Sequence, residues 1–433
     1  MNKKIVLFSL AATLVAIFVI NHYHRGAMRH GGQENIVTFL QEYIRINTTH
    51  PTPDYDKAIT FLKKHAQADG FLHQEVPLPS GKKVLVITST GTDTTLPALA
   101  LNHHMDVVPA TDAHNWIKPP FAGEIHDGVI IGRGTQDMKG IAAVHYFALK
   151  EYKGLNPQHR RTIHIFAVPE EEVGGFKGTC EFVKTDAFKK LNIGYVIDEG
   201  HASGDNTILD IKVAERKPIQ IQVTSKGELA HGSHLQADNA VHTLIQFLNE
   251  IVTLHETQKG LIAAHQAGEL LSCNITSLTA GIRKENSALK RTNGHIALNM
   301  VPDSAQATID IRVPPTRKKA EIISMLDKIV KKYPKISYTI LAQAFEEPAI
   351  DNYFTDFYQK LAGAIEQNSL QTQPHFFEAS SDLRYYQALG IEGLGLTPFA
   401  IEDNIHGTNE SVPIAELIRG KEIFVQFLKV FCS

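Results

Sequence analysis

The chain has 433 residues, which exceeds one typical compact domain and predicts two domains with ample length for a buried core. Its 43 basic and 46 acidic side chains nearly balance, so the charge gives no reason to expect nucleic acid or another polyanion as a partner. Three widely scattered cysteines without a CxxC pair argue against a disulfide framework.

The N-terminus has the form of an export signal. Two lysines precede sixteen uncharged, nearly all apolar residues at 5–20, and further basic residues follow. No small-x-small cleavage site is evident. We therefore expect residues 1–32 to be an uncleaved signal-anchor and linker that associates with the membrane and leaves the catalytic body exported, in the periplasm or outside the cell. Cleavage would instead give a secreted protein, and the run is a little short of the roughly 20 residues that span a bilayer.

Helices and strands alternate in the next part of the chain. Helical spacing occurs over 35–46, 55–68 and 141–152, and apolar strands are expected over 84–89, 96–102, 161–168 and 193–197. Several of these strands finish in polar residues. The pattern predicts an α/β fold, a mixed, mostly parallel sheet flanked by helices, with its site at the carboxyl ends of the strands.

The pattern changes near residue 217. Strict alternation over 218–225 is followed by a helix at 239–254, strands at 274–278, 295–300 and 305–313, a helix at 318–333 and a strand at 336–342. Apart from the additional short strand at 295–300, this is a β-α-β-β-α-β order, which predicts an inserted smaller α+β domain of ferredoxin-like type over residues 216–340. Helices expected at 353–367, 382–388 and 414–430 return to the first pattern, so 33–215 and 341–433 are predicted to form one catalytic domain.

Histidines and carboxylates stand where the predicted strands end. His104 and Asp106 lie two residues apart and point to one side of an extended strand, so Asp106 can accept one ring N–H of His104 while the other nitrogen binds a metal. Asp137 lies in a glycine-flanked loop, which suits a carboxylate that bridges two ions. These two segments together predict a divalent-metal site.

An acidic triplet, 170–172, follows an apolar strand, so one of Glu171 and Glu172 can bind metal while the other faces the substrate. A solvated turn is the alternative, but clustered carboxylates are costly without a cation. Glu199 again follows an apolar strand, and His406 lies in a polar loop. Two histidines with several carboxylates fit a two-zinc site with a general base better than a Ca²⁺ or Mg²⁺ cage, and the absence of cysteine argues against a structural zinc.

Five motifs carry a resemblance to a known family. HMDVVP (104–109), GRGTQDMKG (132–140), VPEEEVGG (168–175), DEG (198–200) and AHGS (230–233) occur in the order and spacing of the M20 metallopeptidases. Over residues 34–430 the chain resembles that family's aminoacylase-1 subfamily most. The resemblance implies a zinc-dependent amidohydrolase of amino-acid metabolism that cleaves N-acyl-L-amino acids, its small-molecule substrates, to a carboxylate and a free L-amino acid.

The resemblance also implies roles for individual residues. Two Zn²⁺ ions per subunit, or Co²⁺ or Mn²⁺ in their place, would activate a water. Glu171 would be the general base that takes its proton, and Asp106 would orient a ligand. The implied metal ligands are His104 and Glu199 for the first ion, Asp137 as the bridge, and Glu172 and His406 for the second.

Further implied roles involve the inserted domain, which would serve as a lid and dimerisation domain. His231 would act in trans in a homodimer, with His234 as an alternative. Asn299 and Arg312 would hold the substrate carboxylate, and a plain surface ion pair is the alternative for Arg312. Arg384 and Ser381 are weaker candidates for the same task, and His103, where the family has a small residue, is expected to face away from the site.

Two other functions stay open. A dipeptidase or carboxypeptidase of the same family would use the same metals and base. A non-catalytic amino-acid-binding protein would keep the fold, but such a protein has no need of a general base, so the ligand set and Glu171 argue against it.

Overall fold

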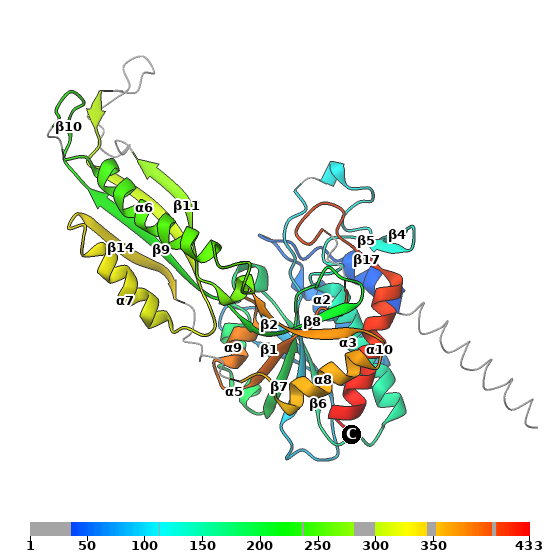
Figure 1. Ribbon diagram of the computed structural model, residues 1–433. Coiled ribbons are helices and arrows are strands. Elements are labelled where there is room, and N and C mark those ends of the chain that lie inside the picture. The colour runs from blue at the N-terminus through cyan, green and yellow to red at the C-terminus, as the bar shows by residue number, and fades with distance from the viewer. Residues whose placement is uncertain (1–35, 112, 236–237, 281–298, 344–351, 401–403) are drawn as a thin grey trace, which may run out of the picture.

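The computed structural model describes residues 36–111, 113–235, 238–280, 299–343, 352–400 and 404–433. Its main elements are an eight-stranded mixed sheet flanked by helices and a separate four-stranded sheet with two helices of its own (Figure 1). The four-stranded sheet has its own hydrophobic core, distinct from those of the large sheet. This architecture confirms the predicted fold class, while the residue boundaries of the two domains stay a prediction.

The large sheet has a parallel centre. Its strand order is β1-β2-β6-β3-β7-β16-β8-β15, and β6, β3, β7 and β16 run parallel to one another. The outer strand pair β8 and β15 is parallel within itself and antiparallel to β16. The strands are β1 (Leu72–Pro77), β2 (Lys83–Ser89), β3 (Ala98–His104), β6 (Ile163–Val168), β7 (Ile193–Asp198), β8 (Ile208–Glu215), β15 (Gln371–Phe377) and β16 (Glu392–Gly395).

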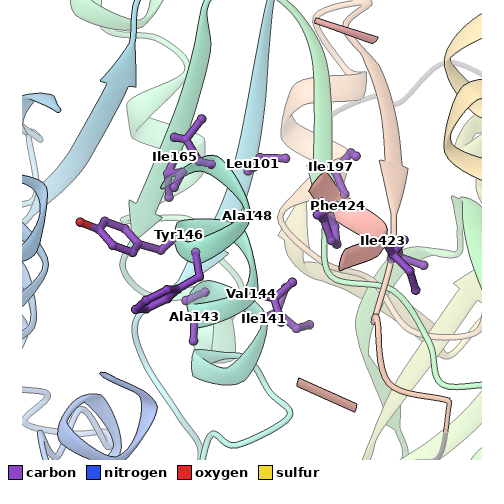
Figure 2. Close-up of a cluster of buried hydrophobic side chains, with 14 of the residues drawn as sticks. Leu101, Ile141, Ala143, Val144, Tyr146, Ala148, Ile165, Ile197, Ile423 and Phe424 are labelled. Carbon is purple, nitrogen blue, oxygen red and sulfur yellow. The ribbon is translucent and has the colours of Figure 1, made fainter. Parts of the chain in front are cut away.

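Helices cover this sheet, and the long helix α3 is largely buried. Figure 2 shows side chains of α3, among them Val144, packed between strand residues such as Leu101 and the Phe424 ring of α10. Because apolar side chains occupy most sides of α3, its burial provides much of the core. The helices of this body are a helix over 36–44, α2 (Tyr55–Ala68), α3 (Lys139–Leu155), α4 (Thr179–Phe182), α5 (Asp186–Lys189), α8 (Asp356–Glu366), α9 (Leu383–Gln387) and α10 (Ile414–Phe431).

The four-stranded sheet has the order β11-β13-β9-β14, with every pair antiparallel. Along the chain this is the expected β-α-β-β-α-β sequence. Buried and half-buried residues alternate along β9 and β13, so one face packs on the helices and the other meets solvent. The elements are β9 (Lys217–Lys226), α6 (Ala240–Lys259), β11 (Ser272–Ala280), β13 (Ser304–Val313), α7 (Lys319–Val330) and β14 (Ile336–Gln343).

Two small sheets complete the described part of the chain. One joins β17 (Ser411–Pro413), β5 (Val129–Ile131) and β4 (Glu124–His126), and the other pairs β10 (Ala230–His231) with β12 (Met300–Val301). Only 299–300 of the strand expected at 295–300 are described.

The sequence patterns gave no indication of β8 or β15. β8 contains Asp210, Lys212 and Glu215, all buried, and these charges interrupt its apolar pattern. The charges are satisfied within the fold, since Lys212 Nζ lies 3.2 Å from Glu215 Oε2. A strand with an internally paired charge set cannot be identified from hydrophobic periodicity alone.

The membrane-anchored or secreted location that was predicted from the N-terminus is wrong. The apolar run at 5–20 on which it rested lies outside the described residues and is shorter than a bilayer span. Among the residues that are described, no helix is long and apolar enough to cross a membrane. Hydrophobicity of so short a run was insufficient ground for the assignment, and the membrane-anchored, exported body is withdrawn.

We expect Phe424→Ala to lower the free energy of unfolding by about 3–5 kcal/mol, because it empties a fully buried ring site between α3 and α10. Phe354→Ala is the matched control. That ring is 57% exposed, so we expect a loss below about 1 kcal/mol. Urea unfolding followed by circular dichroism measures both, and equal losses in the two variants would contradict this account of the core.

Candidate metal centre

Polar residues that follow three parallel strands meet at one edge of the large sheet. β3 ends at His104, β6 leads into the 3-10 helix η2 (Glu171–Val173), and Glu199 directly follows β7. Parallel strands bring their carboxyl ends to the same edge, so these side chains converge. Loops add Asp137, just before α3, and His406, before β17.

The two oxygens of the Asp137 carboxylate contact two different imidazoles. Oδ1 lies 2.8 Å from Nε2 of His104, and Oδ2 lies 3.0 Å from Nε2 of His406. Glu199 Oε2 is 3.9 Å from the same nitrogen of His104, and Glu172 Oε2 is 3.4 Å from that of His406. These five side chains therefore form two adjacent groups that share Asp137.

Asp106 has a different contact from the one expected. His104 Nδ1 is 2.9 Å from the main-chain oxygen of Asp106, and the nearest carboxylate oxygen is 3.8 Å away. The carboxylate instead accepts the main-chain N–H groups of Glu171 and Glu172, at 3.2 and 3.0 Å, and lies 3.0 Å from His50 Nε2. Asp106 thus fixes the His104 ring through its backbone and the turn of η2 through its side chain.

Glu410 holds the loop that carries Asp137. This buried carboxylate accepts the main-chain N–H groups of three loop residues and a side-chain N–H of Arg133. The distances are 3.0 Å from Gly134 N, 2.8 Å from Gln136 N, 3.2 Å from Asp137 N and 2.6 Å from Arg133 Nη1. A loop with so many bonds to one buried anion has little freedom to move the Asp137 side chain.

The turn after η2 requires glycine. Gly175 has φ 66°, and a Cβ added there would lie 2.3 Å from Asp382 Oδ1. Gly174 has φ 95°, and its carbonyl oxygen accepts a hydrogen bond of 2.8 Å from Arg384 Nη2. Left-handed backbone is easy for glycine and costly for other residues, so this pair sets the turn that follows Glu171 and Glu172.

The crowded carboxylates perturb one another. Burial, and then the charge of Glu199, raises the pKa of Glu171 well above its usual value. Burial and then Asp137 raise the pKa of Glu172 to about 7. Burial works against ionisation of Asp137 too, but hydrogen bonds from His104 and His406 prevail and lower its pKa. Hydrogen bonds to Asp137 and Glu172 raise the pKa of His406 to about 10.

This donor set fits divalent cations. Ligand atoms of His104, Glu171 and Glu199, and those of His104, Asp137 and Glu172, lie within 4.8 Å of one another in each group. Glu172 Oε1 is buried and has no hydrogen-bond partner among the described residues. Imidazoles mixed with carboxylates suit zinc-like ions, and a cation would neutralise the mutual repulsion of the acids.

A cavity of about 430 Å³ opens beside these residues. Glu171, Glu172 and His406 line it from the large-sheet body, and Arg312 of β13 lines it from the four-stranded sheet. The guanidinium of Arg312 is held by Asp310 Oδ2, 2.8 Å from Nε, and by Ser380 Oγ, 3.3 Å from Nη1. The cavity is thus bounded by carboxylates on one side and by a positioned cation on the other.

The structure keeps three predicted substrate or catalytic residues away from this cavity. His231 Nε2 lies 3.0 Å from Asn299 Nδ2 where β10 meets β12, at the end of the four-stranded sheet remote from the large sheet (Figure 1). Ser381 is completely buried, and its hydroxyl lies 2.6 Å from Lys212 Nζ and 2.8 Å from Glu215 Oε2. Arg384, by contrast, does line the cavity beside Arg312.

His103 faces the protein interior, as strand alternation predicts. Its ring meets that of Tyr43 edge-on at 6.3 Å, and burial followed by His145 and His104 lowers the pKa of His103 well below its usual value. Sequence reasoning missed Glu410 and Ser380. Glu410 stands in an unremarkable polar loop, and Ser380 is one residue from the serine that was selected, so neither position offered a signal.

Comparisons with known proteins identify the family of the chain. The pattern described as Peptidase family M20/M25/M40 matches residues 100–430. The chain is 32% identical to rat (Rattus norvegicus) aminoacylase-1A, over 92% of this chain and 95% of that protein, and 30% identical to human (Homo sapiens) aminoacylase-1 over the same shares. Its fold is similar to that of an M20 family metallo-carboxypeptidase from Sulfolobus solfataricus, with a TM-score of 0.71, 17% identity, and coverage of 91% of this chain and 98% of the other. The chain therefore belongs to peptidase family M20/M25/M40 and is a metallo-amidohydrolase.

Proposed function

We propose that this metallo-amidohydrolase cleaves N-acyl-L-amino acids to a carboxylate and a free L-amino acid, with two Zn²⁺ ions in its metal centre. The observation that carries the proposal is the sharing of Asp137 between two groups of ligands beside a cavity that Glu171 and Arg312 both line. Similarity to aminoacylase-1 over nearly the whole chain supports the substrate class.

In this proposal His104 and Glu199 would hold one ion, Glu172 and His406 would hold the other, and Asp137 would contribute to both. When bound, zinc supplies Lewis acidity and lowers the pKa of water toward about 7. Glu171 is the general base. Its raised pKa suits a carboxyl group that takes a proton from the attacking water and returns it to the leaving amine. Asp106 keeps Glu171 and Glu172 in place through their backbone amides.

Arg312 recognises the substrate carboxylate, because a guanidinium already oriented by Asp310 and Ser380 loses little freedom on binding an anion. Arg384 stands beside it on the cavity wall. His231 and Asn299 act across a homodimer, each in the active site of the other subunit. There His231 faces the developing negative charge on the acyl oxygen. Both residues lie too far along the inserted sheet to line the cavity of their own chain.

Metal removal tests the activity directly. The full chain should hydrolyse N-acetyl-L-methionine, lose that activity on treatment with a chelator, and regain it with Zn²⁺, because the two ligand groups need cations to offset their repulsion. Released methionine is measured by an amine-reactive assay. Dipeptides ending in methionine form the comparison series. Preference for dipeptides by a zinc-loaded protein would contradict the aminoacylase assignment in favour of a dipeptidase.

Glu171→Gln should keep the zinc content and lower kcat by about 10²–10⁴-fold, since the amide fills the same space and cannot accept the proton. Elemental analysis and initial rates measure the two properties separately. Glu366→Gln, on an exposed helical surface, is the control and should leave both unchanged. Near-normal turnover in the Glu171 variant would remove Glu171 from the mechanism.

Arg312→Ala should lower kcat/KM for N-acetyl-L-methionine by about 10–100-fold, the size of effect expected for a lost charge-assisted hydrogen bond. N-acetyl-L-methioninamide, which lacks the carboxylate, should be a poor substrate and respond little to the change. Arg317→Ala, in a surface pair with Glu321, is the matched control. An equal loss on both substrates would argue that Arg312 supports the fold and not carboxylate recognition.

A further inference from the structure

A second cluster of metal-binding side chains lies outside the proposed catalytic centre. Ligand atoms of His201, Asp210 and His375 lie within 4.8 Å of one another. The three residues come from separate places in the chain: the loop after β7, strand β8 and strand β15. Neither the proposed mechanism nor the five motifs that resemble the M20 family use any of them.

The register of the outer strands creates this cluster. β15 pairs parallel to β8, with Gln373 opposite Asp210 and His375 opposite Lys212, so the four side chains share one face of the sheet. The loop that begins after Glu199 brings the His201 ring over this face, where it stacks on His375 with ring centres 4.6 Å apart and planes at 12°. The two imidazoles thus lie side by side above a buried carboxylate.

The Asp210 carboxylate is held in place and lies close to one of the imidazoles. Asp210 is 2% exposed, and its Oδ1 accepts a hydrogen bond of 2.8 Å from Gln373 Nε2, which orients the carboxylate. The other oxygen, Oδ2, lies 3.5 Å from Nδ1 of His375. Neighbouring ligand atoms around a four-coordinate zinc stand about 3.4 Å apart, so this pair already has the required spacing.

The His375 ring gives a second, independent indication. Its side chain is 13% exposed, and its Nε2 is buried without a hydrogen-bond partner among the described residues. Glu378 Oε2 makes an ion-pair contact of 3.8 Å with this nitrogen, which is longer than a hydrogen bond and close enough for the carboxylate to serve as a further oxygen donor. A buried imidazole nitrogen that lacks a hydrogen bond is costly unless something else binds it.

We propose that His201, Asp210 and His375, with Glu378 beside them, form a further divalent-cation site of zinc type. Two imidazole nitrogens and carboxylate oxygens match zinc, whereas Ca²⁺ and Mg²⁺ take oxygen ligands. Binding of an ion requires the two rings to tilt out of their stacked arrangement, so that one nitrogen of each points at the ion. The ion fastens the loop that begins at Glu199 to the edge strand β15, so it is structural and adds stability in proportion to its binding.

The experiment compares the zinc content of three variants with that of the full-length chain. Each protein is saturated with Zn²⁺, freed of excess metal by gel filtration and measured by elemental analysis. His375→Ala and His201→Ala should each contain about one zinc fewer per chain than the unchanged protein. His265→Ala is the matched control and should lose none, because it removes an imidazole 3.9 Å from Glu269 at a place where no third ligand from the described part of the chain converges.

Added Zn²⁺ should also raise the thermal unfolding temperature of the unchanged chain more than that of either variant. Equal zinc content in the unchanged chain and both variants would overturn the proposal. If His375→Ala does not fold, His201→Ala decides, because its side chain lies on a loop outside the strands. Zinc content is measured without any activity, and His375 lies on β15, away from the ligands of the catalytic centre, so failure here and failure of the proposed function are distinguishable.

Discussion

Two buried carboxylates that accept backbone N–H groups hold the metal centre in shape. Asp106 accepts the amides of Glu171 and Glu172, and Glu410 accepts those of the loop that leads to Asp137. Charge-assisted hydrogen bonds of this kind are about twice as strong as neutral ones. The loops therefore have a fixed backbone before any ion binds, which allows several acidic side chains to be presented at one place despite their repulsion.

Behind the centre lies a layer of buried polar groups that balances this charge. Lys212 is fully buried, and burial, the largest single influence, acts to lower its pKa. The carboxylates around it together outweigh burial and raise the pKa of Lys212. Its ammonium group bonds the Ser381 hydroxyl, which also lies 3.2 Å from Asp198 Oδ2, next to Glu199. An unpaired buried charge would be strongly destabilising, so this network has to be complete for β7 and β8 to lie in the buried part of the sheet. Ser381 thus supports the metal centre from behind. It does not line the cavity, where its contact with substrate was predicted.

The sequence predicted the residues that gather at the site better than it predicted the strands around them. Apolar strands that end at or shortly before His104, Glu171 and Glu199 carry a strong local signal, because hydrophobic periodicity predicts the strand and the polar residue marks its end. β8 carries the opposite signal, since its buried charges look like surface residues until their partners are known. The predicted partner of the Asp106 carboxylate was wrong for a similar reason. The direction of a side chain on a strand shows only which groups it can reach, and here the backbone amides of a turn distant in sequence bind the carboxylate in place of the His104 ring.

The inserted sheet places Arg312 and His231, the two residues proposed to act on the substrate, at opposite ends. Arg312 pairs with Pro218 at the end of β9 that meets the large sheet, whereas His231 follows β9 beyond its other end at Lys226. A strand of ten residues spans about 33 Å, so one rigid sheet cannot bring both to a single substrate of amino-acid size. If both act on one substrate, His231 has to come from another copy of the chain. The length of β9 is thus the physical argument for a dimer that completes the site. In the proposed reaction, the distance between the two ends of this sheet is therefore as important as the metal ligands.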